Sequence, residues 1–162
     1  MHIDSKLPKK IIFGVMALPI NKNKDFLLSK RHAPNTSVWH NKWQVAGGGL
    51  EFGETPEQGV AREIQEELGV SLRILHPNPI VKTSIWYGKE TDTKMDAQII
   101  LTTYIVDVGD QKVDVSGDEE TGDFGWFGLE EALRLDTLPM TPEIVQEAYK
   151  MCNQYGLWNM LQ

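Results

Sequence analysis

The segment from Thr55 to Gly69 constrains the fold most, because it carries both the start and the stop signals of one helix. Thr55 can cap the N-terminus, Pro56 suits the first helical position, and Gln58 stands where a capping box requires it. Gly69 suits the left-handed residue that ends many helices. Three apolar residues at helical spacing predict its buried stripe: Ala61, Ile64 and Leu68. We therefore expect a helix of about four turns.

Strand-like segments lie on both sides of this helix. They are rich in β-branched and aromatic residues and are separated by polar turns. The clearest predicted strands are residues 11–20, 26–32, 97–108 and 124–129. A short helix over 129–135 and a final helix from Thr141 to about Asn153 complete the chain. This order predicts an α/β fold in which helices cover a mixed sheet.

Length and composition narrow the class of protein. A chain of 162 residues predicts a single domain, 1–162, and the net charge of −7 argues against binding long nucleic acid. No apolar run reaches the length of a membrane-spanning helix, and the run after Lys9-Lys10 lacks a cleavage site, so we expect a cytoplasmic protein with no membrane partner. The single cysteine, Cys152, fits a reducing compartment and a packed apolar role.

Three carboxylates share one side of the predicted helix, roughly opposite the apolar stripe. Glu63, Glu66 and Glu67 stand at i, i+3 and i+4, where like charges repel, and they also oppose the helix dipole. A divalent cation with oxygen ligands, Mg²⁺ or Mn²⁺, would remove this conflict. The alternative is a solvated acidic face. The preceding glycines, 47–49, favour a site because they let the backbone approach a ligand closely.

The stretch from Gly48 to Val70 resembles the Nudix box, Gly-x5-Glu-x7-Arg-Glu-U-x-Glu-Glu-x-Gly-U, where U is a bulky aliphatic residue. All nine fixed positions match: Gly48, Glu54, Arg62, Glu63, Ile64, Glu66, Glu67, Gly69 and Val70. One flanking residue departs from many relatives, since Ala46 stands where they have proline. The resemblance implies a Nudix-type α/β/α sandwich with a mixed central sheet.

The resemblance also implies hydrolysis of a pyrophosphate bond in a nucleoside diphosphate linked to another group, with Mg²⁺ or Mn²⁺. Glu66 and Glu67 correspond to the main metal ligands, and Glu63 to a further ligand or the base that activates water. The carbonyl of Gly47 is expected to touch the metal. Arg62 and Glu54 are expected to form an orienting ion pair.

Candidate residues also lie outside the box. The family often adds an acid from a late loop, for which we favour Glu120 and place Glu119 second; a solvated acidic loop is the alternative. Lys30 and Arg31 can hold a substrate phosphate, or be ordinary surface charge. Trp39 and Trp86 can stack on a base, although aromatic residues more often pack in a core.

Several alternatives stay open for the substrate and for assembly. The short chain and the sequence LEFGE favour a nucleoside triphosphate, cleaved to a monophosphate and pyrophosphate. The alternatives are an NDP-sugar or ADP-ribose pyrophosphatase, and a domain that senses a nucleotide ligand without cleaving it. The partner is in each case a small nucleotide. Family members often dimerise, and the apolar tail 155–162 can pack on its own core or on a second copy in a homodimer.

Overall fold

The structure is a computed structural model that describes residues 6–35, 38–91 and 93–162. Strands lie before and after the helix that begins at Pro56, and helices end the chain, as the sequence predicts. The order is β1 (Lys9–Pro19), β2 (Phe26–Arg31), β3 (Trp43–Gln44), β4 (Ala46–Gly49), α1 (Pro56–Leu68), β5 (Arg73–Ile74), β6 (Ile80–Trp86), α2 (Gly88–Thr91), β7 (Asp96–Asp107), β8 (Thr121–Phe127), α3 (Leu129–Ala132), α4 (Thr141–Gln154) and the 3₁₀ helix η1 (Leu157–Met160).

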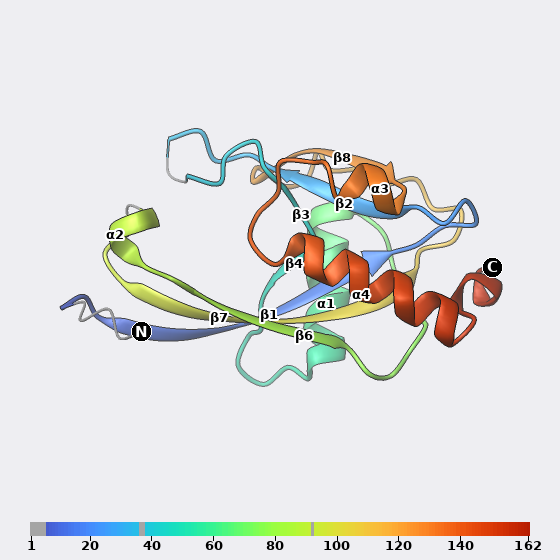
Figure 1. The fold of residues 1–162 in the computed structure, drawn as a ribbon, viewed down its shortest axis with the longest axis horizontal. Helices are drawn as coiled ribbons and strands as arrows, with labels where there is room; N and C mark the ends of the chain where they lie inside the picture. Colours follow the sequence, from blue (N-terminus) through green and yellow to red (C-terminus); the bar gives the residue numbers. More distant parts are fainter. Residues whose placement is uncertain (1–5, 36–37, 92) are drawn as a thin grey trace.

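Two sheets form the centre of the molecule (Figure 1). The larger has the strand order β4-β1-β7-β5, and β6 also pairs with β7. β1 and β7 run parallel, whereas β4, β5 and β6 pair antiparallel with their neighbours, so the sheet is mixed as predicted. The smaller sheet, β3-β2-β8, is antiparallel.

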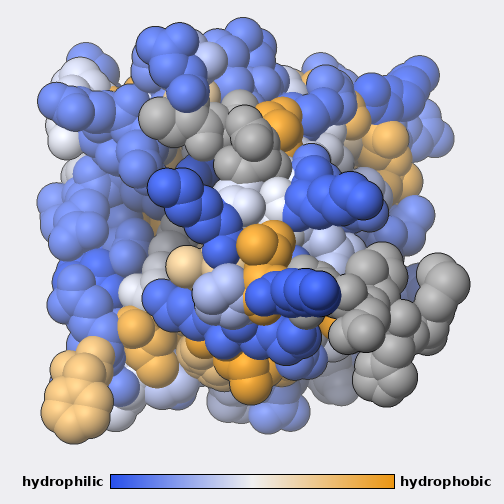
Figure 2. Space-filling model, turned by 90° about the vertical axis from the view of Figure 1, so that its left-hand side faces the viewer, coloured by the Kyte–Doolittle hydropathy of each residue, from blue (hydrophilic) through white to orange (hydrophobic). Residues whose placement is uncertain are grey.

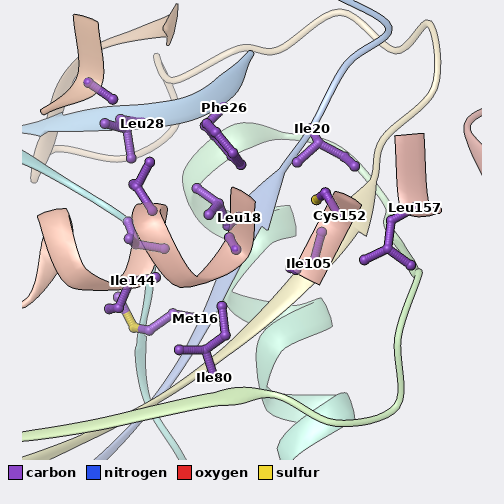
Figure 3. Packing of buried hydrophobic residues seen from close by; sticks show 14 of the residues in the cluster. Met16, Leu18, Ile20, Phe26, Leu28, Ile80, Ile105, Ile144, Cys152 and Leu157 are labelled. Atoms are coloured by element: carbon purple, nitrogen blue, oxygen red, sulfur yellow. The ribbon is translucent and has the colours of Figure 1, made fainter. Parts of the chain in front are cut away.

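β1 shows why helices cover both faces of the larger sheet. Its side chains alternate between two faces, and both sets are apolar. Val15 and Ala17 belong to the cluster that contains the buried residues of α1. Met16 and Leu18 belong to the cluster that contains α4 (Figure 3). In Figure 1, α4 crosses in front of the sheet and α1 lies behind it, which confirms the expected α/β/α arrangement.

Helix α1 has the predicted caps. Thr55 Oγ1 accepts from Gln58 N–H, the Gln58 side chain accepts from Thr55 N–H, and Gly69 ends the helix with a φ of 67°. The predicted buried stripe is wrong at one position, because Val60 is buried and Ala61 is exposed. The helix turns Val60 toward β1 because the neighbouring Gly59 has no side chain to hold the helix away from Val15 and Leu50.

The C-terminal part closes the second core. Cys152 is fully buried there, as predicted. Residue Met140, rather than Thr141, occupies the N-cap of α4, and it makes no side-chain cap bond. The tail packs on its own core: Leu157 is buried and the Trp158 ring lies 5.7 Å from that of Phe26. No helix among the described residues is long and apolar enough to cross a bilayer.

Candidate active site

The glycines of β4 bring backbone directly against the carboxylates of α1. Gly47 has a φ of 141°, and its N–H donates to Glu67 Oε2 at 3.0 Å. At Gly48, an added Cβ would lie 2.6–2.8 Å from the atoms of the Glu63 carboxylate. The structure thus shows the glycine backbone close to the α1 carboxylates, and its predicted approach to a ligand stays a prediction. The expected contact between the Gly47 carbonyl and a metal stays a prediction.

Arg62 is the centre of an ion-pair network. Its Nε donates to Glu54 Oε1 at 2.5 Å and its Nη2 to Glu54 Oε2 at 3.0 Å, so the predicted pair is bidentate. Nη1 donates to Glu63 Oε1 at 2.7 Å and, at 3.4 Å, to Glu66 Oε2. The hydrogen bond from Arg62 lowers the pKa of Glu54, and the bonds to Glu54 and Glu63 hold the pKa of Arg62 above its usual value. Arg62 therefore joins the loop before the helix to two carboxylates of the helix.

The three carboxylates differ in burial, which corrects the prediction that they lie together opposite the apolar stripe. Glu66 is mostly exposed, with 59 % of its side chain accessible, against 14 % for Glu63. Glu67 is three residues after Ile64, so it lies beside the buried stripe rather than opposite it. Burial raises the pKa of Glu63, and it raises that of Glu67 to about 8.

The donor set suits a hard divalent cation, although the described side chains do not form a complete metal-binding cluster. Among the described residues, no group of three or more His, Cys, Asp or Glu side chains converges closely enough to hold a metal ion. Arg62 bonds Glu63 and Glu66, while no arginine or lysine of the described chain forms an ion pair with Glu67. All three ligand candidates offer carboxylate oxygens, which Mg²⁺ and Mn²⁺ prefer. A cation would therefore compete with Arg62 for two of them.

In the acidic loop before β8, Asp118 is the residue whose charge acts on a carboxylate of the site. Its charge contributes to the raised pKa of Glu67, after burial and the Glu63 charge. Asp118 also accepts from Glu120 N–H and Thr121 Oγ1, which holds it in a turn. The side chains of Glu119 and Glu120 are exposed, and the metal-binding role expected of Glu120 stays a prediction. Sequence reasoning missed Asp118; the turn pattern of an Asp bonding the N–H two residues on could have indicated it.

An apolar pocket of about 220 Å³ adjoins the carboxylates across β4. One wall is the sheet: Ile12 pairs with Ile99 and Gly14 with Leu101, so all four positions share one face. Leu138, Pro139 and Thr141, before and at the start of α4, line it as well. Gly47, Gly48, Gly49 and Arg31 also line it, and so does Trp86.

The two basic residues at the end of β2, Lys30 and Arg31, have different surroundings. Arg31 lines the pocket, and its charge counters the raised pKa of Glu67. Its Nε is buried and has no hydrogen-bond partner within the described chain. Lys30 is not among the lining residues, and its Nζ lies 5.5 Å from the centre of the Trp43 ring. Neighbouring strand residues point to opposite faces, which separates the two cations.

The two aromatic residues predicted to stack on a base contact each other, and one of them lines the pocket. The rings of Trp39 and Trp86 lie 5.4 Å apart, tilted by 50°, and Trp86 lines the pocket. Their contact links the loop after β2 to the end of β6. Whether either ring stacks on a base stays a prediction.

Comparisons with known proteins find relatives of this sequence and of this fold. The family model described as NUDIX domain matches residues 10–148. Nucleoside triphosphatase NudI of Enterobacter sp. (strain 638) is 33 % identical over 118 residues, which cover 73 % of this chain and 84 % of that protein. The crystal structure of a MutT protein from Methanosarcina mazei Go1 is similar with a TM-score of 0.65 and 26 % identity, covering 93 % of this chain and 99 % of its own. A Nudix hydrolase structure from Listeria monocytogenes shares the fold with a TM-score of 0.68 at 17 % identity, over 88 % of this chain and 95 % of its own.

Proposed function

The chain belongs to the Nudix hydrolase family, and on that premise we propose that it hydrolyses a nucleoside triphosphate to a monophosphate and pyrophosphate. The observation that carries the proposal is the placement of Glu63 and Glu67 against the glycine backbone that lines an apolar pocket. The name of the Enterobacter relative, a nucleoside triphosphatase, supports a triphosphate over an NDP-sugar or ADP-ribose.

Glu63, Glu66 and Glu67 are the residues that would hold Mg²⁺ or Mn²⁺. When bound, such a cation neutralises the charge that develops on the phosphates and lowers the pKa of a water molecule. Glu63 serves as a further ligand or as the base for that water. Arg62, held by Glu54, keeps α1 and the loop before it in fixed relation, so the carboxylates need little rearrangement during the reaction.

The substrate would lie along the pocket. Arg31 would bind a phosphate oxygen near the glycines, since a guanidinium suits phosphate geometry. The apolar lining toward Trp86 would receive the nucleobase, because flat heterocycles bury well against apolar and aromatic groups. Glu120 would be the further metal-binding acid from outside the box, and its neighbours Glu119 and Asp118 are the alternatives.

A single substitution tests the carboxylate assignment. We expect Glu67→Gln to lower Mg²⁺-dependent turnover by at least about a hundredfold, because it removes charge stabilisation from phosphoryl transfer. The assay measures released phosphate species from nucleoside triphosphates, NDP-sugars, ADP-ribose and dinucleoside polyphosphates, with Mg²⁺ or Mn²⁺.

The matched control is Glu57→Gln, the same change at an exposed position of the same helix, which should keep wild-type turnover. Near-normal turnover of Glu67→Gln would refute the assignment. An NDP-sugar or ADP-ribose as the best substrate would replace the triphosphate in the proposal, and no turnover on the whole panel would favour the ligand-sensing alternative.

A further inference from the structure

Two buried side-chain N–H groups have no hydrogen-bond partner among the described residues: Arg31 Nε and Trp86 Nε1. Both residues line the pocket. Buried donors without a partner are rare, because each has lost its bonds to water and gained none in return. Both groups can only donate, so we expect a ligand that fills the pocket to present hydrogen-bond acceptors to them.

Arg31 and Trp86 belong to opposite ends of the pocket. Arg31 lies near the box carboxylates, because its charge acts on one of them. The strand register places Gly47 level with Met16 of β1, and Trp86 level with Lys10, six residues earlier. At about 3.3 Å per residue, the two levels are about 20 Å apart along the sheet. This separation leaves room for phosphates at one end and a base at the other.

The indole ring of Trp86 lies at the edge of the molecule rather than in its core. β6 ends beside α2, where the larger sheet projects beyond α1 and α4 (Figure 1). Figure 2 looks onto this end, where most of the surface is hydrophilic. The ring is half-buried and lies 5.4 Å from that of Trp39, which belongs to the loop after β2. Because Nε1 is buried in the present position of the ring, the ring must rotate for a ligand to reach it. The neighbouring Trp39 ring is at most a weak acceptor, so it does not satisfy this donor.

The chemistry of the bases shows which acceptor would meet Trp86. The exocyclic group opposite the glycosidic bond is the part of a base that lies farthest from the phosphates. In uracil and hypoxanthine this group is a carbonyl oxygen, which accepts, whereas in cytosine and adenine it is an amino group, which donates. An amino group facing Trp86 Nε1 would place two donors against each other and leave both unpaired. The other uncharged polar side chains of the pocket, Gln44 and Thr141, can each donate or accept, so they do not choose between the two groups.

We propose that Trp86 determines base specificity, its Nε1–H donating to the exocyclic carbonyl oxygen of a keto base. Keto nucleotides are then preferred to amino nucleotides of the same ring size. Stacking, the role expected from the sequence, uses the face of the ring, whereas this role uses the N–H at its edge. The inference rests on the proposed function, since it uses the same pocket and the same orientation of the nucleotide, and it adds the class of base.

Two pairs of triphosphates test the preference, because the members of each pair differ at this exocyclic group: UTP with CTP, and ITP with ATP. We expect the keto member of the better-cleaved pair to have at least about tenfold higher kcat/KM, because the amino member leaves a buried donor unpaired. Trp86→Phe keeps an aromatic ring but removes the N–H, and should reduce this ratio to about threefold or less. Trp158→Phe is the matched control, the same substitution outside the pocket, and should keep the wild-type ratio.

Binding is measured separately from turnover, with ¹⁵N-labelled protein in EDTA so that no metal-dependent cleavage occurs. The chain has five tryptophans, and the indole N–H signal that is missing in Trp86→Phe belongs to Trp86. Hydrogen bonding moves an N–H proton signal downfield. We therefore expect the keto nucleotide of the better-bound pair to move the Trp86 signal downfield and the amino nucleotide not to do so.

Thermal melts establish that both variants fold. Equal kcat/KM values within the better-cleaved pair, or a ratio that survives Trp86→Phe, would overturn the inference. Absence of turnover on all four triphosphates would instead refute the proposed hydrolysis, and the indole signal would then decide the inference, since it requires binding and no cleavage. A Trp86 signal that no keto nucleotide moves, whether the nucleotide binds elsewhere or does not bind, would overturn it.

Discussion

The Glu67 carboxylate lies beside the buried stripe of α1 and accepts a backbone hydrogen bond from Gly47. Burial disfavours its charged form and raises its pKa from the ordinary 4.5 to about 8. The metal-free folded protein therefore binds a proton here that the unfolded chain releases above pH 4.5. A carboxylate that we propose as a cation ligand thus makes the metal-free protein less stable at alkaline pH.

Glu67→Gln is accordingly expected to raise the melting temperature of the metal-free protein at pH 8.5 and to change it little at pH 5. The stability associated with protonated Glu67 is fully present below its unfolded pKa and is lost as the pH rises toward 8, at up to about 1.4 kcal/mol per pH unit. Glutamine resembles the protonated acid and has no such loss. Calorimetry in EDTA at both pH values measures the difference, and an equal shift at both would contradict it.

Gly48 and Gly49 offer a matched pair of substitutions. A Cβ at Gly48 would meet the Glu63 carboxylate at less than 3.0 Å, whereas a Cβ at Gly49 would meet nothing within 4 Å. Because the obstructing group is the end of a flexible side chain, Gly48→Ala should displace the carboxylate at little cost in stability. We expect turnover to fall by at least about tenfold, on the scale of misplaced catalytic groups.

Gly49→Ala should keep a melting temperature close to that of the wild type, and its turnover should fall less than that of Gly48→Ala, because its Cβ does not meet a carboxylate. Steady-state kinetics and thermal melts of the two variants make the comparison. Equal turnover of both variants would show that the contact between Gly48 and Glu63 has no part in the reaction.

Among the elements, α1 has end residues that stabilise the helix and clustered glutamates that destabilise it. Its capping box and left-handed Gly69 satisfy backbone groups at both termini. Its last turn contains no basic residue, although two glutamates lie near that end, where the dipole prefers cations. The caps and the packing of Val60, Ile64 and Leu68 keep this stretch helical despite the charge repulsion.

Removal of the N-cap should show how much the stability of α1 depends on its cap. Thr55→Ala deletes the hydroxyl that accepts from Gln58 N–H, and we expect the free energy of unfolding to fall by about 1 kcal/mol. Urea denaturation measures the change. A fall below about 0.3 kcal/mol would mean that tertiary packing, rather than the cap, determines where the helix begins.

For the molecule as a whole, the larger sheet separates two surfaces. One face of its projecting end lines the pocket beside the box carboxylates, and the other carries the exposed apolar residues Ile11, Val81 and Ile85. Both derive from the alternation of side chains along β1 and β6, in which apolar residues occupy both sets of positions. A single strand pattern thus supplies one wall of the pocket and an exposed apolar face.

Local signals in the sequence were enough to predict the position and caps of α1, the main strands and the ion pair between Arg62 and Glu54. These features depend on hydrogen bonds, charges or apolar periodicity among residues close in the chain, and the structure confirms them. The nine box positions likewise identified the family, because family membership follows from residue types at fixed spacing.

Only the tertiary structure decided which side of α1 is buried. As a result, Val60 rather than Ala61 belongs to the buried stripe, and Glu67 lies beside the core. The tertiary structure also decided that Arg31 lines the pocket while Lys30 lies against Trp43. It placed Asp118 where its charge raises the pKa of Glu67. Each of these outcomes depends on how α1, β2 and the late loop dock against strands far away in the sequence. Periodicity defines the faces of an element, but packing against its neighbours determines which face meets the core.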